Sequence, residues 1–132
     1  MWYYGNRLFD IEKDLGDNIG FVYLITNLTN GKKYIGKKLF EFTRTKKVKG
    51  KKKKTKIQSD WIDYFGSNNV LQADVERLGP DKFRRTILRL CKSKGTCNYW
   101  EAYEIMVREA ITSDEYYNEW LSVKVSRSQI KF

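Results

Sequence analysis

The sequence predicts an α+β fold, a small three-stranded, mainly antiparallel sheet flanked by helices. Segments rich in β-branched and aromatic residues alternate with segments whose apolar residues recur every three to four positions. An Asn-Gly pair separates the first two strand-like segments, which is typical of a hairpin and therefore of antiparallel pairing. The chain has 132 residues, enough for one domain with a modest core.

Three segments carry the composition of β-strands. The first, FVYLIT at 21–26, and the second, KKYIGKK at 32–38, flank the turn NLTNG at 27–31. The third, KFRRTILRL at 82–90, follows a predicted helix. These segments supply the three strands of the expected sheet.

The first helix is predicted over residues 68–80. Asn68 or Asn69 is suited to cap its beginning, and Gly79 with Pro80 ends it. Its apolar residues lie at helical spacing and predict a buried stripe made of Leu71, Val75 and Leu78.

The second helix is predicted over residues 97–112, in CNYWEAYEIMVREAIT. Large or apolar residues again recur every three to four positions. They predict a core-facing stripe made of Trp100, Tyr103, Val107 and Ala110. The segment between the hairpin and the first helix, SDWIDYFGS at 59–67, is aromatic and irregular.

The net charge of the chain is strongly positive. It has 26 Lys and Arg against 16 Asp and Glu, a net charge of +10. This excess favours a polyanionic partner, nucleic acid above all, and a merely soluble basic surface is the alternative. Residues 1–19, in contrast, are acidic and aromatic, so we expect them to pack on the domain or on a second copy of it.

The positive charge is concentrated in KKVKGKKKKTK, residues 46–56. Like-charge repulsion and Gly50 predict a mobile loop in the free protein. We interpret the run as a loop that grips phosphates, with a solvated charge run as the alternative. The lysines predicted to bind DNA are Lys46, Lys47, Lys49, Lys51, Lys52, Lys53, Lys54 and Lys56.

Several protein classes fit the composition poorly. No apolar stretch approaches the length of about 18–20 residues that spans a bilayer, and the first residues lack a signal-peptide pattern. The chain has no histidine, and Cys91 and Cys97 alone cannot complete a tetrahedral zinc site. We expect reduced thiols, no membrane partner and a cytoplasmic location, which includes the cytoplasm of a phage-infected host cell.

Five features in order resemble the GIY-YIG nuclease family. FVY, ten residues and then YIG resemble the two tyrosine-bearing strands of its catalytic hairpin, with Tyr23 and Tyr34 as the tyrosines. Arg44 stands ten residues after the second tyrosine, where the family has its catalytic arginine. Glu101 lies four residues before an isoleucine, as on the family's catalytic glutamate helix, and Asn118 in YYN matches a frequent late asparagine.

The resemblance implies roles in phosphodiester hydrolysis for these residues. Tyr23 would deprotonate or position the attacking water, and Tyr34 would orient the water or the phosphate. Arg44 would stabilise negative charge in the transition state, for which a guanidinium is suited. Lys37, directly after YIG, could hold the water or the phosphate, with strand-end solvation as its alternative role.

The resemblance also implies a divalent metal, Mg²⁺ or Mn²⁺, with Glu101 as its one protein ligand. Glu104, one helical turn later, is the rival ligand; its alternative role is an ion pair with Arg108 on the outer face of the helix. We favour Glu101, because it borders the predicted core stripe and has no such cation to neutralise it.

Two departures from the family pattern concern the segment after YIG. Several members have histidine or tyrosine fourteen residues past the second tyrosine, where this chain has Val48 inside the lysine run. The usual first helix is therefore expected to be interrupted by a basic insertion at 45–58, with Arg44 on a short turn. Tyr64 is a candidate for the missing side chain, and a packed aromatic is its other interpretation.

Together these features predict a DNA endonuclease, freestanding and of homing or phage type, that acts as a monomer or a homodimer on DNA. The expected organisation is an extension at 1–19, a nuclease-like domain at 20–120 and a tail at 121–132. The alternatives are a catalytically silent nucleic-acid-binding protein on the same fold and a basic packaging or ribosome-associated protein.

Overall fold

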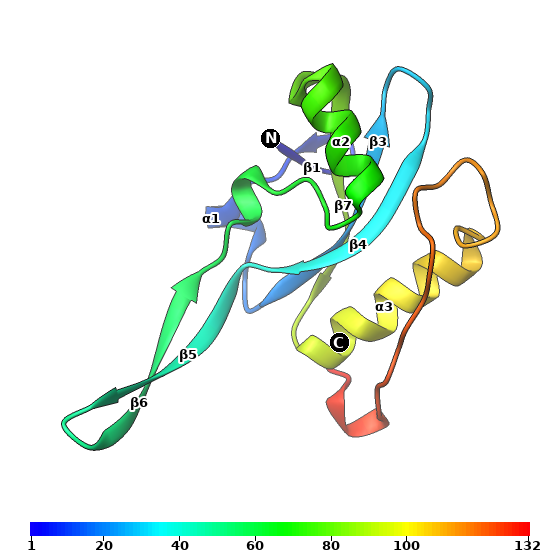
Figure 1. Cartoon of the computed structure of the whole chain (residues 1–132). Coiled ribbons are helices and arrows are strands. Elements are labelled where there is room, and N and C mark those ends of the chain that lie inside the picture. Colours follow the sequence, from blue (N-terminus) through cyan, green and yellow to red (C-terminus); the bar gives the residue numbers. More distant parts are fainter.

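The protein forms a five-stranded sheet with helices on both faces (Figure 1). In this computed structural model, residues 1–45, 47 and 49–132 are described in full. The order of the strands in the sheet is β2-β1-β7-β3-β4. Their bounds are Trp2–Tyr4 (β1), Arg7–Leu8 (β2), Gly20–Asn27 (β3), Lys33–Leu39 (β4) and Phe83–Cys91 (β7).

The three predicted strands are confirmed, and they are antiparallel: β3 pairs with β4 on one side and with β7 on the other. The expected count of three was wrong, because β1 adds to β7 in parallel and β2 adds to β1. These added strands have three and two residues, too few to show a period-two pattern. Burial of Trp2, which is 4% exposed, fixes β1 against the core.

Two helices cover opposite faces of the sheet. The face with Phe21 and Tyr23 packs against α2 (Asn69–Leu78), whereas the face with Val22 and Ile35 packs against α3 (Lys94–Val107). A shorter helix, α1 (Ile11–Asp14), follows the first two strands. Single 3₁₀ turns occupy Trp61–Asp63, Pro80–Lys82 and Arg127–Gln129.

The predicted ends of α2 are confirmed. The Asn68 side chain accepts a hydrogen bond from the backbone N–H of Leu71, as an N-cap does. Gly79 ends the helix with a φ of 96°, a conformation that side chains disfavour. Leu71 and Val75 are buried in the core, as their spacing predicted.

The predicted stripe of α3 was right for Ala110, which is buried, and for Trp100, which packs against the core, but wrong for Tyr103 and Val107, which are exposed. The helix buries Cys97, Glu104 and Ile105. The guanidinium of Arg89, whose side chain is one-third exposed, lies 3.7 Å from the centre of the Trp100 ring and 5.3 Å from that of Tyr103. A partly exposed guanidinium thus takes the contact of Tyr103 that the pattern assigned to the apolar core.

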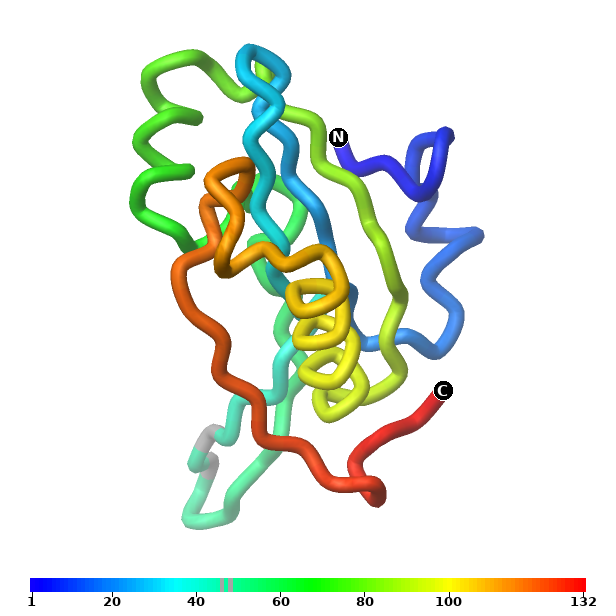
Figure 2. Tube along the Cα trace, turned by 90° about the vertical axis from the view of Figure 1, so that its right-hand side faces the viewer, coloured from blue at the N-terminus to red at the C-terminus, as the bar shows by residue number. Residues whose placement is uncertain are grey.

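The basic run is a β-hairpin and not the mobile loop that its charge predicted. Its strands are β5 (Glu41–Val48) and β6 (Lys51–Gln58), paired antiparallel along their whole length. Lys49 and Gly50 form the turn with φ values of 50° and 77°, as in a tight two-residue hairpin turn. The hairpin projects away from the five-stranded sheet as a separate ribbon (Figures 1 and 2).

The C-terminal tail crosses the beginning of α3 (Figure 2). The Ser93 hydroxyl donates a hydrogen bond to the carbonyl of Gln129, and the Thr96 hydroxyl both donates to and accepts from the backbone of Lys131. A Cβ on Gly95 would collide with Gln129, so the close contact requires glycine at this position. No helix in the described part of the chain is long and apolar enough to cross a membrane.

Candidate active site

The two tyrosines of the hairpin lie side by side at the edge of the sheet. Gly36 on β4 stands opposite Tyr23 on β3, so Tyr34 is the diagonal neighbour of Tyr23 on the same face. Their ring centres are 6.2 Å apart. Tyr64, from the aromatic segment before α2, packs edge-on against Tyr23 with ring centres 6.0 Å apart.

Gly36 opens a path for the hydroxyl of Tyr23. The side chain of this tyrosine is 1% exposed, yet it lines a cavity of about 580 Å³ beside β4. A Cβ on Gly36 would lie on the Tyr23 hydroxyl and 2.5 Å from its Cζ. Because β4 is the edge strand, the missing side chain lets a buried phenol reach the rim of the sheet.

Glu101 reaches the same cavity from the opposite face of the sheet. It lies on α3, is mostly buried, and its carboxylate is 4.0 Å from Nζ of Lys37 on β4. Burial raises the pKa of Glu101, and the nearby Lys37 opposes this shift. The Lys37 ammonium also donates a hydrogen bond to Asn98. The cavity therefore wraps around the edge of β4 and joins phenols from one face with a carboxylate and an ammonium from the other.

Burial affects the phenols as well. It raises the pKa of Tyr23 well above its ordinary value, and the neighbouring Tyr64, Tyr34 and Glu101 act in the same direction. The pKa of Tyr34 is also raised, mainly by burial, although a hydrogen bond with the Ser67 hydroxyl at 3.0 Å opposes the shift. Both phenols are thus protonated near neutral pH and can donate hydrogen bonds.

Asn118 forms two hydrogen bonds with the backbone of the edge strand and so clasps it. Its side-chain amide accepts a hydrogen bond from the N–H of Ile35 at 3.0 Å and donates one to the carbonyl of Ile35 at 2.9 Å. The amide mimics a neighbouring strand at the position just before Gly36. Its predicted contact with DNA stays a prediction, and the structure shows that it fixes the edge strand where the cavity begins.

Glu104, the rival carboxylate, faces away from this cavity. It accepts hydrogen bonds from Arg89 and Arg108, each at 2.9 Å, and is 7% exposed. Burial alone would raise the pKa of Glu104, but the two guanidinium groups outweigh it and lower the pKa. The alternative role as a partner of Arg108 is confirmed, whereas the predicted place on the outer face of the helix was wrong.

The structure does not bring Arg44 into the cavity. Arg44 lies on β5 opposite Thr55, is exposed, and does not line the cavity that contains the tyrosines. The expectation of a short turn at this position was wrong, because the residue belongs to the ribbon. Its predicted catalytic role stays a prediction.

The predicted DNA-binding lysines lie on the same ribbon. The side chain of Lys46, like that of Val48, lies outside the described residues. The remaining lysines are exposed to solvent: Lys47, Lys49, Lys51, Lys52, Lys53, Lys54 and Lys56.

Sequence reasoning missed part of the cavity wall. Ser67 follows the aromatic segment, and Glu119 with Trp120 follows the asparagine that clasps β4. The Trp120 side chain is 75% exposed. The sequence offered one signal for this wall, a tryptophan two positions after Asn118. No periodic pattern surrounds it that would have predicted its place.

The donor groups of the cavity fit a hard divalent cation. Within the fully described ranges, no group of three or more His, Cys, Asp or Glu side chains could hold a metal. Mg²⁺ commonly uses one or two carboxylates and keeps water molecules as its other ligands. Glu101 is a carboxylate of this kind, but the expectation that no cation neutralises it was wrong, because Nζ of Lys37 lies 4.0 Å from its carboxylate.

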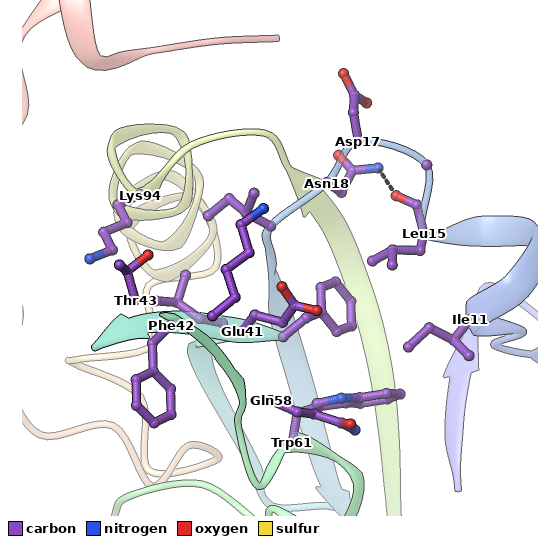
Figure 3. A pocket seen from close by; sticks show the side chains of 15 residues that line it. Ile11, Leu15, Asp17, Asn18, Glu41, Phe42, Thr43, Gln58, Trp61 and Lys94 are labelled. Carbon is purple, nitrogen blue, oxygen red and sulfur yellow. Dashed lines mark hydrogen bonds between the residues drawn. The ribbon is translucent and has the colours of Figure 1, made fainter. Parts of the chain in front are cut away.

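A second cavity lies elsewhere, between the N-terminal segment and the base of the ribbon (Figure 3). Its volume is about 500 Å³, and mainly apolar side chains such as Ile11, Leu15 and Trp61 line it. It contains none of the predicted catalytic residues. The cavity beside β4, which does contain predicted catalytic residues, is therefore the candidate active site.

Replacing Gly36 by alanine is expected to destabilise the protein by about 1–3 kcal/mol, the usual cost of overpacking a core. The new Cβ would meet the hydroxyl and Cζ of Tyr23, whose ring is packed in the core. Chemical denaturation measures the change. In a Tyr23→Leu background the same substitution should cost much less, and equal costs in both backgrounds would contradict the proposed contact.

The comparisons with known proteins agree with this geometry. A family model described as "Putative endonuclease segE, GIY-YIG domain" matches residues 2–121. A protein of Enterobacteria phage T4 that carries the same segE name is 37% identical over 99 residues, which are 74% of this chain and 39% of that protein. The chain thus matches well under half the length of this relative. No solved structure matches the chain. The chain belongs to the GIY-YIG family, in its segE group.

Proposed function

We propose that the protein is an endonuclease that hydrolyses phosphodiester bonds in DNA with the help of a divalent metal. The observation that supports this proposal most is the cavity beside β4. It joins two phenols, an ammonium and a mostly buried carboxylate from separate parts of the chain. The family match and the name of the phage relative point to the same chemistry. The freestanding, homing or phage type and the oligomeric state on DNA stay predictions.

Each group has a role that suits hydrolysis at phosphorus. The phenols of Tyr23 and Tyr34 are donors near neutral pH, so in this proposal they orient the attacking water and a phosphoryl oxygen rather than accept a proton. Lys37 supplies positive charge to the phosphate. Preorganised donors and charges of this kind stabilise the transition state most when they need no rearrangement.

Glu101 would hold Mg²⁺ or Mn²⁺ in this cavity. The bound ion would stabilise charge on the phosphate oxygens and favour ionisation of water. The protein's own part is to keep the Glu101 carboxylate ionised next to Lys37 and to hold its helix in place. The tail that crosses the start of α3 serves the second purpose.

Cleavage of supercoiled plasmid tests the proposed function. We expect the protein with Mg²⁺ to convert the plasmid to nicked or linear forms. The matched control is the double variant Tyr23→Phe/Glu101→Gln, purified in parallel, which excludes a contaminating nuclease. A protein that shifts the plasmid in a gel but leaves it supercoiled would be the silent nucleic-acid-binding alternative, and the proposal would fail.

Tyr23→Phe is expected to lower the cleavage rate by about 10²-fold, the loss typical of one preorganised donor. The phenol does not titrate near neutral pH because burial raises its pKa. The pH-rate profile of the variant should therefore keep the shape of the wild-type profile. In both proteins the rate should fall at acidic pH, as Glu101 with its raised pKa becomes protonated. If the wild-type rate changes at alkaline pH and the rate of the variant does not, Tyr23 would instead be identified as the base.

A further inference from the structure

The ribbon formed by β5 and β6 carries positive charge on both of its faces. Residues directly opposite each other in an antiparallel pair share a face, and successive residues alternate between faces. Lys47 stands opposite Lys52, and Thr45 opposite Lys54, on one face. Arg44 stands opposite Thr55 on the other face, which also carries Lys51 and Lys53.

Among the ribbon side chains that the structure describes, no apolar layer covers either face beyond the base. Residues 51–56 are exposed, as are Thr43, Arg44, Thr45 and Lys47. The ribbon also sets Lys47 and Lys52 directly opposite each other, and like charges in that relation are destabilising. Two uncovered cationic faces are suited to a partner that presents negative charge on both sides of the ribbon.

The two phosphate backbones of a DNA groove present charge in this way. The strands of a two-stranded ribbon are about 4.8 Å apart, and its side chains project from both faces. The major groove of B-DNA is about 12 Å wide and 8.5 Å deep and admits a β-ribbon. Standing on its long edge, the ribbon would direct each face toward one backbone.

The base of the ribbon is firmly attached to the core. Phe40, between β4 and β5, is 3% exposed and lies with its ring centre 5.1 Å from that of Trp61. The N–H of Ser59 donates a hydrogen bond to the carbonyl of Phe40, which closes the hairpin at its base. The ribbon therefore projects from a fixed point.

Positive charge continues from this base toward the catalytic cavity. A further cavity of about 490 Å³ contains Phe42 of the ribbon together with Lys37, Lys38 and Lys94, and also Asp60, which forms an ion pair with Lys38. Lys37 also lines the cavity of the tyrosines. A backbone held by the ribbon thus has a basic path to the site.

We propose that the β5–β6 ribbon inserts edgewise into the major groove of duplex DNA, with one cationic face against each phosphate backbone. This inference rests on the proposed function only in taking DNA as the polyanion. It goes beyond a general phosphate grip, because it requires both faces to make contact at once.

Two variants with equal charge loss on opposite faces test the inference. Lys52→Gln/Lys54→Gln removes two charges from one face, and Lys51→Gln/Lys53→Gln removes two from the other. Binding of the full-length protein to a labelled duplex is measured by fluorescence anisotropy over a range of salt, with EDTA to prevent cleavage. For each variant the slope of log affinity against log salt should become shallower by about 2, since each duplex contact contributes about 0.9.

Competition identifies the groove. Methyl green, a major-groove ligand, should displace the protein, whereas netropsin, a minor-groove ligand, should not. Equal loss of slope in both variants together with displacement by methyl green supports the inference. If the slope changes in one variant alone, the inference is overturned in favour of a ribbon that lies along a single backbone. If the slope changes in neither variant, the lysine run is a solvated surface that does not bind DNA.

These results are independent of catalysis. If plasmid is cut but neither slope changes, the ribbon inference fails and the proposed function stands. If both slopes change but no plasmid is cut, the ribbon inference stands and the nuclease proposal fails. The four lysines are exposed, and removing them relieves repulsion across the ribbon, so both variants should melt no lower than the wild type, which excludes misfolding.

Discussion

Glu101→Gln is expected to abolish cleavage, lowering the rate on the order of 10³-fold, while binding to DNA is retained. The substitution keeps the shape of the side chain and removes the charge that would hold the metal. Cleavage and binding of the same duplex, measured in parallel, separate the two effects. Affinity should be equal or higher, because a negative charge near phosphate has been removed.

The same variant should not lose stability. Burial raises the pKa of Glu101, so above that pKa the folded state bears the cost of a charged, mostly buried carboxylate. Glutamine removes this cost. The variant should therefore melt at an equal or higher temperature than the wild type near neutral pH. The difference should shrink as the pH falls below the raised pKa and vanish below the ordinary pKa of a glutamate. A lower melting temperature with loss of binding would indicate a structural role instead.

Glu119→Gln is the matched control, since Glu119 is an exposed carboxylate on the wall of the same cavity. It should cut within a few-fold of wild type. If this variant is inactive and Glu101→Gln cuts normally, the metal site is placed on the wrong carboxylate.

Removal of divalent metal is expected to stop cleavage altogether without releasing DNA. The proposed binding surface consists of lysines that need no metal, whereas the proposed chemistry depends on one ion near Glu101. EDTA should leave the anisotropy of a labelled duplex high while plasmid cutting ceases, and added Mg²⁺ or Mn²⁺ should restore cutting.

A readout other than activity locates the ion. Without DNA, Mn²⁺ should raise the melting temperature of the wild type, because a ligand that binds only the folded state stabilises it. The shift should be absent in Glu101→Gln and present in Glu119→Gln. Cutting that persists in EDTA, or equal shifts in all three proteins, would contradict the metal assignment.

Local patterns in the sequence predicted the central part of the fold well. The Asn-Gly turn and the β-branched runs sufficed for β3 and β4, and Asn68 and Gly79 marked α2 correctly. Turn, strand and cap preferences depend on a few neighbouring residues, so they can be recognised from the sequence alone. The tyrosine pair followed from the same hairpin, since its register sets Tyr23 and Tyr34 diagonally on one face.

What the sequence did not reveal depends on contacts between distant residues. The first strand is stabilised by pairing with β7, and the three residues of β1 contain no pattern that predicts this pairing. The grip of Asn118 on Ile35 joins positions 83 residues apart. Charge repulsion predicted a loop at 46–56, but the turn at Lys49 and Gly50 and the anchored base favour a hairpin that propensity alone disfavours.

The order of strands has a consequence for synthesis on the ribosome. The central strand, β7, lies late in the sequence, and both β1 and β3 pair with it. A nascent chain that has emerged only as far as the ribbon lacks its central strand, the Glu101 helix and the Asn118 clasp. Cationic lysines are thus exposed to nucleic acid before the cavity beside β4 exists. The topology therefore delays completion of the proposed site until β7, α3 and Asn118 have been made, whereas the basic ribbon emerges earlier.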